Sequence, residues 1–205
     1  MMKKVFAIVA LAAMFFAGKA QAQISVNVGF APETFTTKFG NDSSTENYQG
    51  FFAGVTYIVP IVSGFGVAVG PQFRMNTKST SVTILNITTS VKDTQMLIDV
   101  PVLFNYAIGV SRDFSIAPFV GPMFSYAVSG TTKTTVGTNA NTSKWYGDNS
   151  GLNPFNINVV GGVSASYSMV KLFAGYRLGL MDQEKNSDII TLKTQGFFVG
   201  LGFDF

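Results

Sequence analysis

The sequence contains no cysteine and no histidine among its 205 residues. Without cysteine, the chain has no disulfide, thiolate metal site, cysteine nucleophile or lipid-anchored cysteine. Without histidine, it lacks the commonest general base and metal ligand of proteins. The two absences argue against an enzyme, and we expect neither a metal ion nor another cofactor.

Charge is the next scarce feature. Charged residues make up 12% of the chain, against about 25% in average proteins. Hydrophobic residues make up 47%, and the mean hydropathy is +0.31. Such a chain is too hydrophobic to be disordered and too poor in charge for an ordinary cytosolic surface.

Residues 1–22 have the pattern of a cleaved secretory signal peptide. Lys3 and Lys4 precede an unbroken apolar run from Val5 to Ala17, and Ala20–Ala22 is a small-x-small cleavage site. A membrane anchor is the alternative, but the apolar run is too short to span a bilayer as a helix. The mature chain is therefore expected to be residues 23–205.

The net charge of +3 belongs to this first segment. Removing Lys3, Lys4 and Lys19 lowers the 14 basic residues to 11, which equals the 11 acidic residues. A formally neutral mature chain gives no support to a nucleic-acid partner.

After residue 22 no stretch approaches the roughly 20 apolar residues of a membrane helix. The recurrent pattern is instead the period-two alternation of β-strands. The last segment shows it best, because Phe197, Val199, Leu201, Phe203 and Phe205 share one face. Alternation predicts about eight strands, in the ranges 24–30, 51–59, 65–75, 96–106, 116–128, 155–167, 172–180 and 197–205.

The two faces of these strands differ in a way that favours lipid outside. The apolar face carries no charge and is rich in Phe and Tyr, whereas the other face is rich in Gly and carries Arg74, Asp99, Lys171, Arg177 and Asp204. A soluble barrel would show the same periodicity, but with its charges outward. We therefore predict an all-β protein: a transmembrane, up-and-down antiparallel β-barrel in the outer membrane.

The connections alternate in length, as they do in outer-membrane barrels. Short turns are expected at Pro60–Gly64, Gly109–Asp113 and Ser168–Met169, and both termini should lie on their periplasmic side. Long polar segments, expected as extracellular loops, are 32–48, 76–94, 129–153 and 182–195.

Three local features add expectations. Pro101, Pro118 and Pro122 fall inside strands and predict bulges or missing ladder bonds. The β-branched segment Val82–Val91 predicts a hairpin above the membrane, which either binds partners by strand addition or stiffens the loop. Trp145–Tyr146 is expected to rest at the membrane interface rather than to act as a contact point.

Four of the expected strands carry similar motifs, in the segments Gln95–Tyr106, Pro118–Tyr126, Asn158–Tyr167 and Phe173–Leu180. These segments resemble the PorT-like outer-membrane β-barrel proteins of Bacteroidetes and, more distantly, small OmpA- and OmpX-like barrels. Gln95–Tyr106 (QMLIDVPVLFNY) is similar to a proline-containing strand of that family, with Asp99 where Glu is common. The next strands of the family are similar to Pro118–Tyr126 (PFVGPMFSY), Asn158–Tyr167 (NVVGGVSASY) and Phe173–Leu180 (FAGYRLGL). The resemblance implies an integral outer-membrane barrel but no particular transport or secretion role.

The chain end carries a further resemblance. Phe205 resembles the terminal aromatic residue that the outer-membrane assembly machinery reads, and Phe203 and Leu201 share its face. We therefore expect periplasmic chaperones and the barrel assembly machinery as partners, together with outer-membrane lipid.

Candidate site residues lie on both faces. Tyr57, Tyr106 and Tyr167 fall near one end of the barrel and predict a periplasmic aromatic girdle. Arg74, Asp99 and Arg177 point inward and form either a charged constriction that selects solutes or a buried charge network. A network is favoured, with Arg74 paired to Asp99, because about eight strands leave room only for side chains. The apolar side chains expected to share that interior are Phe52, Phe119, Met123, Phe173 and Phe198.

The predicted function is a structural or surface-interaction role through the extracellular loops, without catalysis. The alternative is a narrow pore or a transport- or secretion-associated outer-membrane component. An unknown surface protein or ligand at the loops is the further partner, and the chain is expected to act as a monomer.

Overall fold

The structure is a computed structural model that describes residues 23–84, 87–147, 151–184 and 190–205. The predicted signal peptide, residues 1–22, lies outside the described residues. Within the described ranges, no helix is long and apolar enough to cross a membrane. The strands are β1 (Gln23–Phe30), β2 (Glu33–Phe39), β3 (Asp42–Val62), β4 (Phe65–Val69), β5 (Gln72–Ile84), β6 (Ile87–Tyr106), β7 (Ile108–Gly109), β8 (Phe114–Val136), β9 (Asn139–Lys144), β10 (Phe155–Tyr167), β11 (Val170–Gly179) and β12 (Ile190–Asp204).

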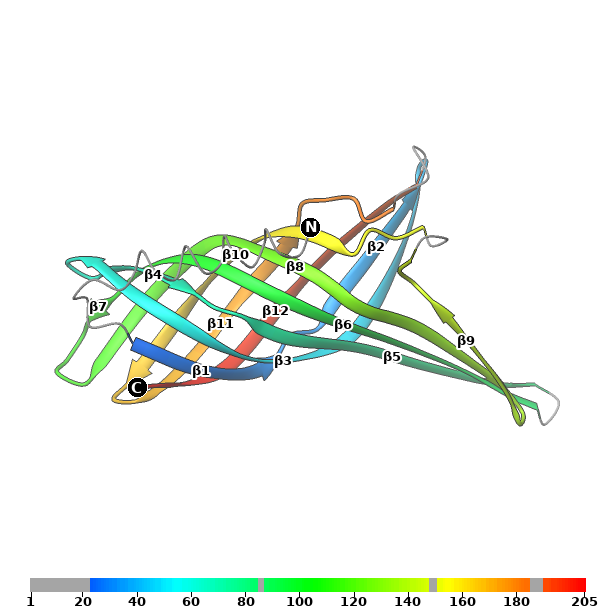
Figure 1. Ribbon diagram of the computed structural model, residues 1–205, viewed down its shortest axis with the longest axis horizontal. Helices are drawn as coiled ribbons and strands as arrows, with labels where there is room; N and C mark the ends of the chain where they lie inside the picture. Colours follow the sequence, from blue (N-terminus) through cyan, green and yellow to red (C-terminus); the bar gives the residue numbers. More distant parts are fainter. Residues whose placement is uncertain (1–22, 85–86, 148–150, 185–189) are drawn as a thin grey trace.

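The strands form one antiparallel sheet that closes on itself (Figure 1). β1 and β2 are successive parts of one barrel strand, as are β4 and β5, and β6 and β7, while β9 lies beside β8 beyond the barrel wall. Counted in this way the wall has eight strands, and it closes where β1 pairs with β12. The predicted eight-stranded, up-and-down barrel is confirmed.

Prolines interrupt the ladder at several of these junctions. β1 gives way to β2 at Pro32, and β4 gives way to β5 at Pro71, because proline cannot donate to a neighbouring strand. The β6–β8 ladder has no partners between Pro101 and Phe104, as expected for a proline inside a strand. At Pro118 the register with β10 runs on without a shift. On the other side of Pro118, however, the ladder breaks between the Asn105–Phe119 pair of β6 and β8 and the Ile108–Ile116 pair of β7 and β8, so a ladder partner is missing there as well.

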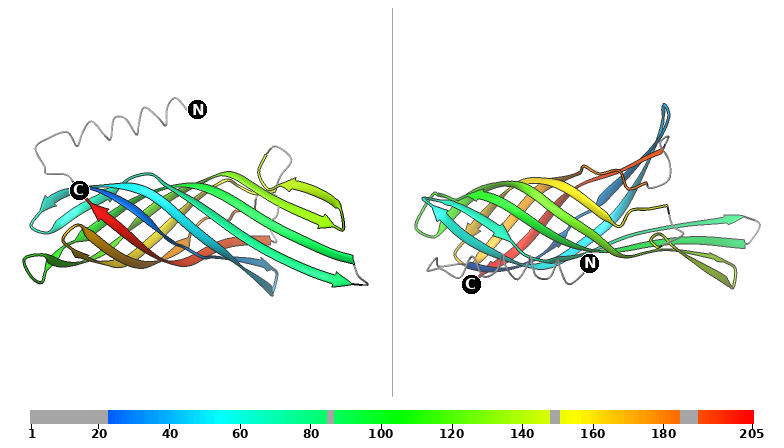
Figure 2. Two further views of the ribbon diagram at one scale, coloured as in Figure 1. Left: turned by 90° about the horizontal axis from the view of Figure 1, so that it is seen from below. Right: turned by 45° about the horizontal axis from the view of Figure 1, so that its top comes forward.

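Within the described residues, much of the four long polar segments is paired in strands rather than irregular, which corrects the sequence-based expectation of loops. Two arms of paired strands extend from one end of the barrel (Figures 1 and 2). We call β2 with the adjoining parts of β3 and β12 the β2 arm, and β9 with the adjoining parts of β5, β6 and β8 the β9 arm. The arms separate where the β3–β5 ladder ends, at Gln49 and Thr77.

These segments form strands because they are rich in Thr, Ser and other residues that suit a pleated surface even in water. The predicted hairpin over Val82–Val91 is part of the β9 arm, where β5 pairs with β6. We call this end of the molecule the hairpin end. The opposite end, which holds the short turns and the C-terminus, is the turn end (Figure 1).

The wall carries its apolar side chains on the outside. Val28, Leu172 and Phe197 are each about half exposed, at 49%, 52% and 54%. The inner face is packed by phenylalanine rings over glycines. Each ring lies on the glycine directly opposite it on the neighbouring strand, in the pairs Phe52–Gly29, Phe119–Gly162, Phe198–Gly175 and Phe173–Gly200. This inside-out distribution is that of a barrel surrounded by lipid.

Candidate functional site

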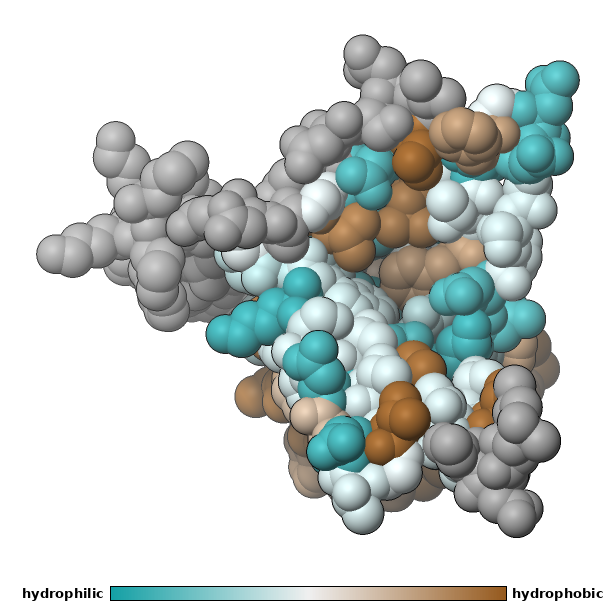
Figure 3. Space-filling model, turned by 90° about the vertical axis from the view of Figure 1, so that its right-hand side faces the viewer, coloured by the Kyte–Doolittle hydropathy of each residue, from teal (hydrophilic) through white to brown (hydrophobic). Residues whose placement is uncertain are grey.

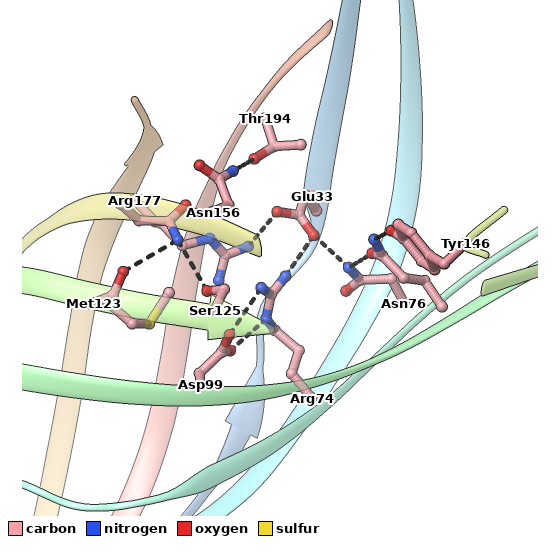
Figure 4. A network of polar contacts seen from close by, with 12 residues as sticks. Glu33, Arg74, Asn76, Asp99, Met123, Ser125, Tyr146, Asn156, Arg177 and Thr194 are labelled. Atoms are coloured by element: carbon pink, nitrogen blue, oxygen red, sulfur yellow. Dashed lines mark hydrogen bonds and ion pairs between the residues drawn. The ribbon is translucent and has the colours of Figure 1, made fainter. Parts of the chain in front are cut away.

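A cluster of charged side chains lies inside the barrel near the hairpin end (Figure 4). Arg74 on β5 donates to Asp99 on β6 through Nε, at 2.7 Å from Oδ2, and through Nη2, at 3.2 Å from Oδ1. Arg74 is 2% exposed and Asp99 is 1% exposed. The two residues singled out from inward parity on neighbouring strands therefore make a buried, two-pronged ion pair.

Glu33, at the start of β2, joins the two arginines. It accepts from Arg74 Nη1 and from Asn76 Nδ2, and its Oε1 atom lies 3.3 Å from Arg177 Nη2. Sequence reasoning missed Glu33 because it placed the residue in a loop after Pro32. A signal was available: Glu33 continues the inward parity of Ser25 and Asn27 across the proline.

The cluster is balanced in charge, with Arg74 and Arg177 against Glu33 and Asp99. Balance matters because an unpaired charge in a buried site is strongly destabilising. The weakest member is Arg177, whose Nε and Nη2 atoms have no hydrogen-bond partner among the described residues, although Nη2 is ion-paired with Glu33. We refer to these four residues as the charge network.

Amides and hydroxyls extend the charge network across the lumen. Asn76 donates to Gln95 at 2.9 Å, and Gln95 donates to the Tyr146 hydroxyl at 2.6 Å. On the opposite wall two further buried asparagines donate to hydroxyls, Asn158 to Ser125 at 2.9 Å and Asn156 to Thr194 at 3.2 Å. Polar groups of both walls thus fill the barrel at this level (Figure 4).

Aromatic rings cover the charge network on its hairpin side. Phe35 and Tyr48, from the β2 arm, have ring centroids 4.7 Å apart, and Trp145 packs edge-on against both at 6.4 and 6.1 Å. Trp145 Nε1 donates to Thr132 of the β9 arm at 2.7 Å. We call Phe35, Tyr48, Trp145 and Tyr146 the aromatic lid, and it joins the two arms at their base. Figure 3, which looks onto the hairpin end, shows hydrophobic surface in the hollow between the arms.

The aromatic lid corrects the expectation for Trp145 and Tyr146. Both turn inward over the barrel mouth rather than resting on the membrane interface, because the mouth offers ring partners and hydrogen-bond partners. Burial raises the pKa of Tyr146 to about 12, so its hydroxyl remains protonated at neutral pH.

The turn-end half of the interior is not filled by side chains. A cavity of about 640 Å³ reaches from the charge network to the short turns, where Gly64 and Ser168 line it. The expected side-chain-filled interior is therefore wrong for this half, where the inward phenylalanine rings line the cavity. The barrel has a filled outer half and a hollow inner half.

A second ion pair lines the cavity at the turn end. Lys171 Nζ donates to Asp204 at 2.8 Å and to Ser25 Oγ at 2.7 Å. A serine beside a lysine can serve as a nucleophile and its base. Here, however, Ser25 accepts from the lysine and directs its own proton to Asn27, at 3.0 Å. The contact is therefore arranged as a structural bridge.

The remaining predicted residues lie on the outer face toward the turn end. Tyr106 and Tyr167 are 40% and 65% exposed, and Tyr57 pairs with Ile24 beside the chain end. Phe205 joins β1 through backbone hydrogen bonds with Ile24, and the side chains of Phe203 and Leu201 also face outward. Within the described part of the chain, no group of three or more carboxylate or other ligating residues could hold a metal ion.

Solved structures of similar shape are small outer-membrane proteins, at low sequence identity. The attachment invasion locus protein Ail of Yersinia pestis is 14% identical, with 90% of this chain and 99% of Ail covered and a TM-score of 0.49. Neisserial surface protein A is 15% identical, with coverage of 88% and 97% and a TM-score of 0.44. OprG of Pseudomonas aeruginosa is 11% identical, with coverage of 92% and 98% and a TM-score of 0.37.

The sequence itself decides the family. No protein with a curated description matches the chain. The family model described as "Outer membrane protein beta-barrel domain" matches residues 16–183, which is most of the chain. The chain therefore belongs to the outer-membrane protein β-barrel domain family and is an integral protein of the outer membrane.

Proposed function

We propose that this protein is a non-catalytic, non-conducting barrel that holds its two arms at the cell surface for interaction with other molecules. The observation that carries the proposal is that the buried charge network and the packed aromatic lid occupy the lumen. Both lie at the hairpin end, which in bacterial outer-membrane barrels faces outward. A solute entering the cavity from the periplasm would meet a wall of paired charges and packed rings.

The arms supply the means of interaction. In the part of the chain that the structure describes, β9 pairs with β8 alone, so its other edge offers unpaired backbone groups to a strand from a partner. The partner would be a surface protein or ligand outside the cell. The resemblance of β6, β8, β10 and β11 to PorT-like proteins supports placing the chain in that branch of the family, without implying a secretion role.

Solute flux into vesicles tests this proposal. We expect liposomes containing the refolded protein to take up amino acids and monosaccharides no faster than protein-free liposomes, whereas a porin in the same lipid should admit both. Uptake that rises with protein content would contradict it and would support the alternative, a narrow pore or transport component.

The signal peptide and the C-terminal residues belong to the route to the membrane. We infer that residues 1–22 direct export and that Phe205, with Phe203 and Leu201, presents an aromatic, apolar end to the assembly machinery. These residues face outward at the end of β12 and just after it, beside β1, which puts them at the seam where the barrel closes.

A further inference from the structure

Lysines and carboxylates lie on opposite faces of the two arms. On the β9 arm, Lys92, Lys133 and Lys144 are exposed on the outward face, which continues the lipid-facing surface of the barrel. On the β2 arm, Lys38 and Lys193 are exposed on the outward face in the same way. No carboxylate shares these outward faces on the described arm strands.

The carboxylates of the same strand segments all stand at inward-facing positions of the sheet. Asp93 accepts from Thr132 at 2.6 Å and from Tyr48 at 3.3 Å beneath the aromatic lid. Glu46 is paired with Lys78, the one inward lysine on the described arm strands, at 3.1 Å. Glu33 lies in the charge network, and Asp42 has the inward parity at the hairpin tip.

The β9 arm brings its outward lysines close together. Lys92 stands directly opposite Lys133 in the β6–β8 ladder. Lys144, on β9, is opposite Thr131 of β8, which lies two residues nearer the barrel than Lys133 and faces the same way. Like charges directly opposite each other destabilise a sheet. No ion pair relieves these three lysines within the part of the chain that the structure describes. The arrangement calls for an anion from outside the protein.

Lys92 lies a short distance beyond the apolar belt of the barrel, at the height expected for lipid head groups. Met75 and Met96, paired across β5 and β6, are the last apolar residues of the outer belt on these strands. Lys92 precedes Met96 by four positions and so lies farther from the barrel, by roughly 13 Å along the strand at about 3.3 Å per residue. A tilt of about 45° reduces that rise to roughly 9 Å above the hydrocarbon edge.

We propose that the outward faces of the two arms bind the phosphate groups of anionic lipids in the outer leaflet. The three lysines of the β9 arm would share these phosphates, which removes the repulsion between Lys92 and Lys133. Each lysine close to an anionic membrane surface improves association by about fivefold. The arms are then docked on the membrane rather than free in solution, whether or not the barrel conducts.

Because the chain has no cysteine, one labelled position can report on the lipid beside the β9 arm. Thr142 is exposed and directly opposite Lys133. We would couple a fluorophore to Thr142→Cys, refold the protein into phosphatidylcholine vesicles, and add trace lipid with a nitroxide in its head-group region. The nitroxide lipid is either phosphatidic acid or phosphatidylcholine.

The expected result is that phosphatidic acid quenches at least fivefold more effectively than phosphatidylcholine at low salt, the effect of a single lysine. The preference should decline at high salt, because exposed charges are screened. The ratio of quenching by phosphatidic acid to quenching by phosphatidylcholine should fall toward one in the variant Lys92→Gln/Lys133→Gln/Lys144→Gln. The ratio should persist in the corresponding triple Arg variant. Lys78→Gln removes one charge from the inward face and should leave the preference unchanged.

Heat-modifiable migration on gels verifies that each variant has folded before quenching is measured. Three results would overturn the proposal. The first is a quenching ratio of phosphatidic acid to phosphatidylcholine near one in the native protein, the second is the same ratio in the native protein and the triple Gln variant, and the third is no quenching by either lipid. The third result would place the arm away from the bilayer, as expected for a surface that meets only soluble partners.

Discussion

At the scale of single residues, the protein depends on charges that balance inside a lipid-embedded wall. Arg74 contacts both buried carboxylates, Asp99 and Glu33, while Arg177 contacts only Glu33. Removing one charge leaves the other three unbalanced, whereas removing Asp99 and Arg177 together leaves the neutral pair Arg74–Glu33. We therefore expect that the losses of stability caused by substituting Asp99 and Arg177 are not additive.

Asp99→Asn should destabilise the barrel by about 3 kcal/mol, the usual cost of breaking a buried ion pair from one side. Arg177→Gln should also destabilise it, by leaving Glu33 without one of its two cationic partners. In the double variant the loss should be smaller than the sum of the two, by about 1–3 kcal/mol, because charge balance is restored. Equilibrium urea unfolding in lipid vesicles measures all three.

Gel heat-modifiability gives an independent check on the same residues. If the migration shift and the unfolding midpoint of Asp99→Ala match those of the native protein, Asp99 is not part of a stabilising network. Strictly additive losses in the double variant would likewise argue that the two residues act separately.

Because of Tyr146, the stability of the folded protein should depend on pH in the alkaline range. Its pKa is raised by burial from the ordinary value of 10 to about 12, so the folded protein retains this proton more firmly than the unfolded chain. The stabilisation by Tyr146 is therefore complete below pH 10 and is lost as the pH rises toward 12.

Emission from Trp145, the single tryptophan of the chain, can follow unfolding in this pH range. The stability difference between the native protein and Tyr146→Phe should be constant below pH 10 and shrink between pH 10 and 12. A difference that stays constant to pH 12 would show that the hydroxyl is not buried in the aromatic lid.

The residues of the charge network show what parity alone can predict. Alternation placed Arg74, Asp99 and Arg177 inside, because each lies within a long apolar-polar pattern. Glu33 was missed because Pro32 ends the β1 pattern and polar residues follow on both faces. Only the pairing of β2 with β3 and β12 shows that the same inward face continues.

At the scale of elements, neighbouring strands pack on the inner face through phenylalanine rings that lie over glycines, where no Cβ atom would fit. In β10, Gly162 faces Phe119, and a Cβ atom there would lie 2.6 Å from the ring and 2.3 Å from the Ala174 carbonyl oxygen. The neighbouring residue, Gly161, has the opposite parity, and a Cβ atom there would have no contact closer than 3.8 Å. The two adjacent glycines thus serve different purposes.

Gly162→Ala should destabilise the barrel by about 1–3 kcal/mol, because the added methyl group forces a shift of backbone and ring. Gly161→Ala is the matched control and should change stability by less than about 0.5 kcal/mol. Urea unfolding of both variants in the same lipid makes the comparison. Equal effects at the two positions would contradict the packing of Phe119 over Gly162.

The strands also show which parts of the fold the sequence pattern could predict and which it could not. Apolar alternation identified all eight wall strands because lipid requires it on every one. The segments 32–48 and 129–153 show no such alternation, since both faces of an arm meet water or head groups, and they were expected as loops. Their Thr- and Ser-rich pairing in β2, β3, β8 and β9 is visible only in the register of the sheet.

At the scale of the whole molecule, the low charge and high hydrophobicity of the chain reflect an inverted barrel. Its outer surface is apolar, its wall charges point inward, and its lysines above the wall mostly point outward. The lumen is divided into a cavity of about 640 Å³ near the turns and a filled half beneath the arms. We propose that this filled half closes the barrel.

Single-channel recording of the refolded protein in planar bilayers shows whether the lumen is closed. If the charge network and the aromatic lid close the lumen, membranes that contain folded protein should show no resolvable openings at neutral pH. Stable, stepwise openings of uniform conductance would contradict the account and identify the barrel as a pore.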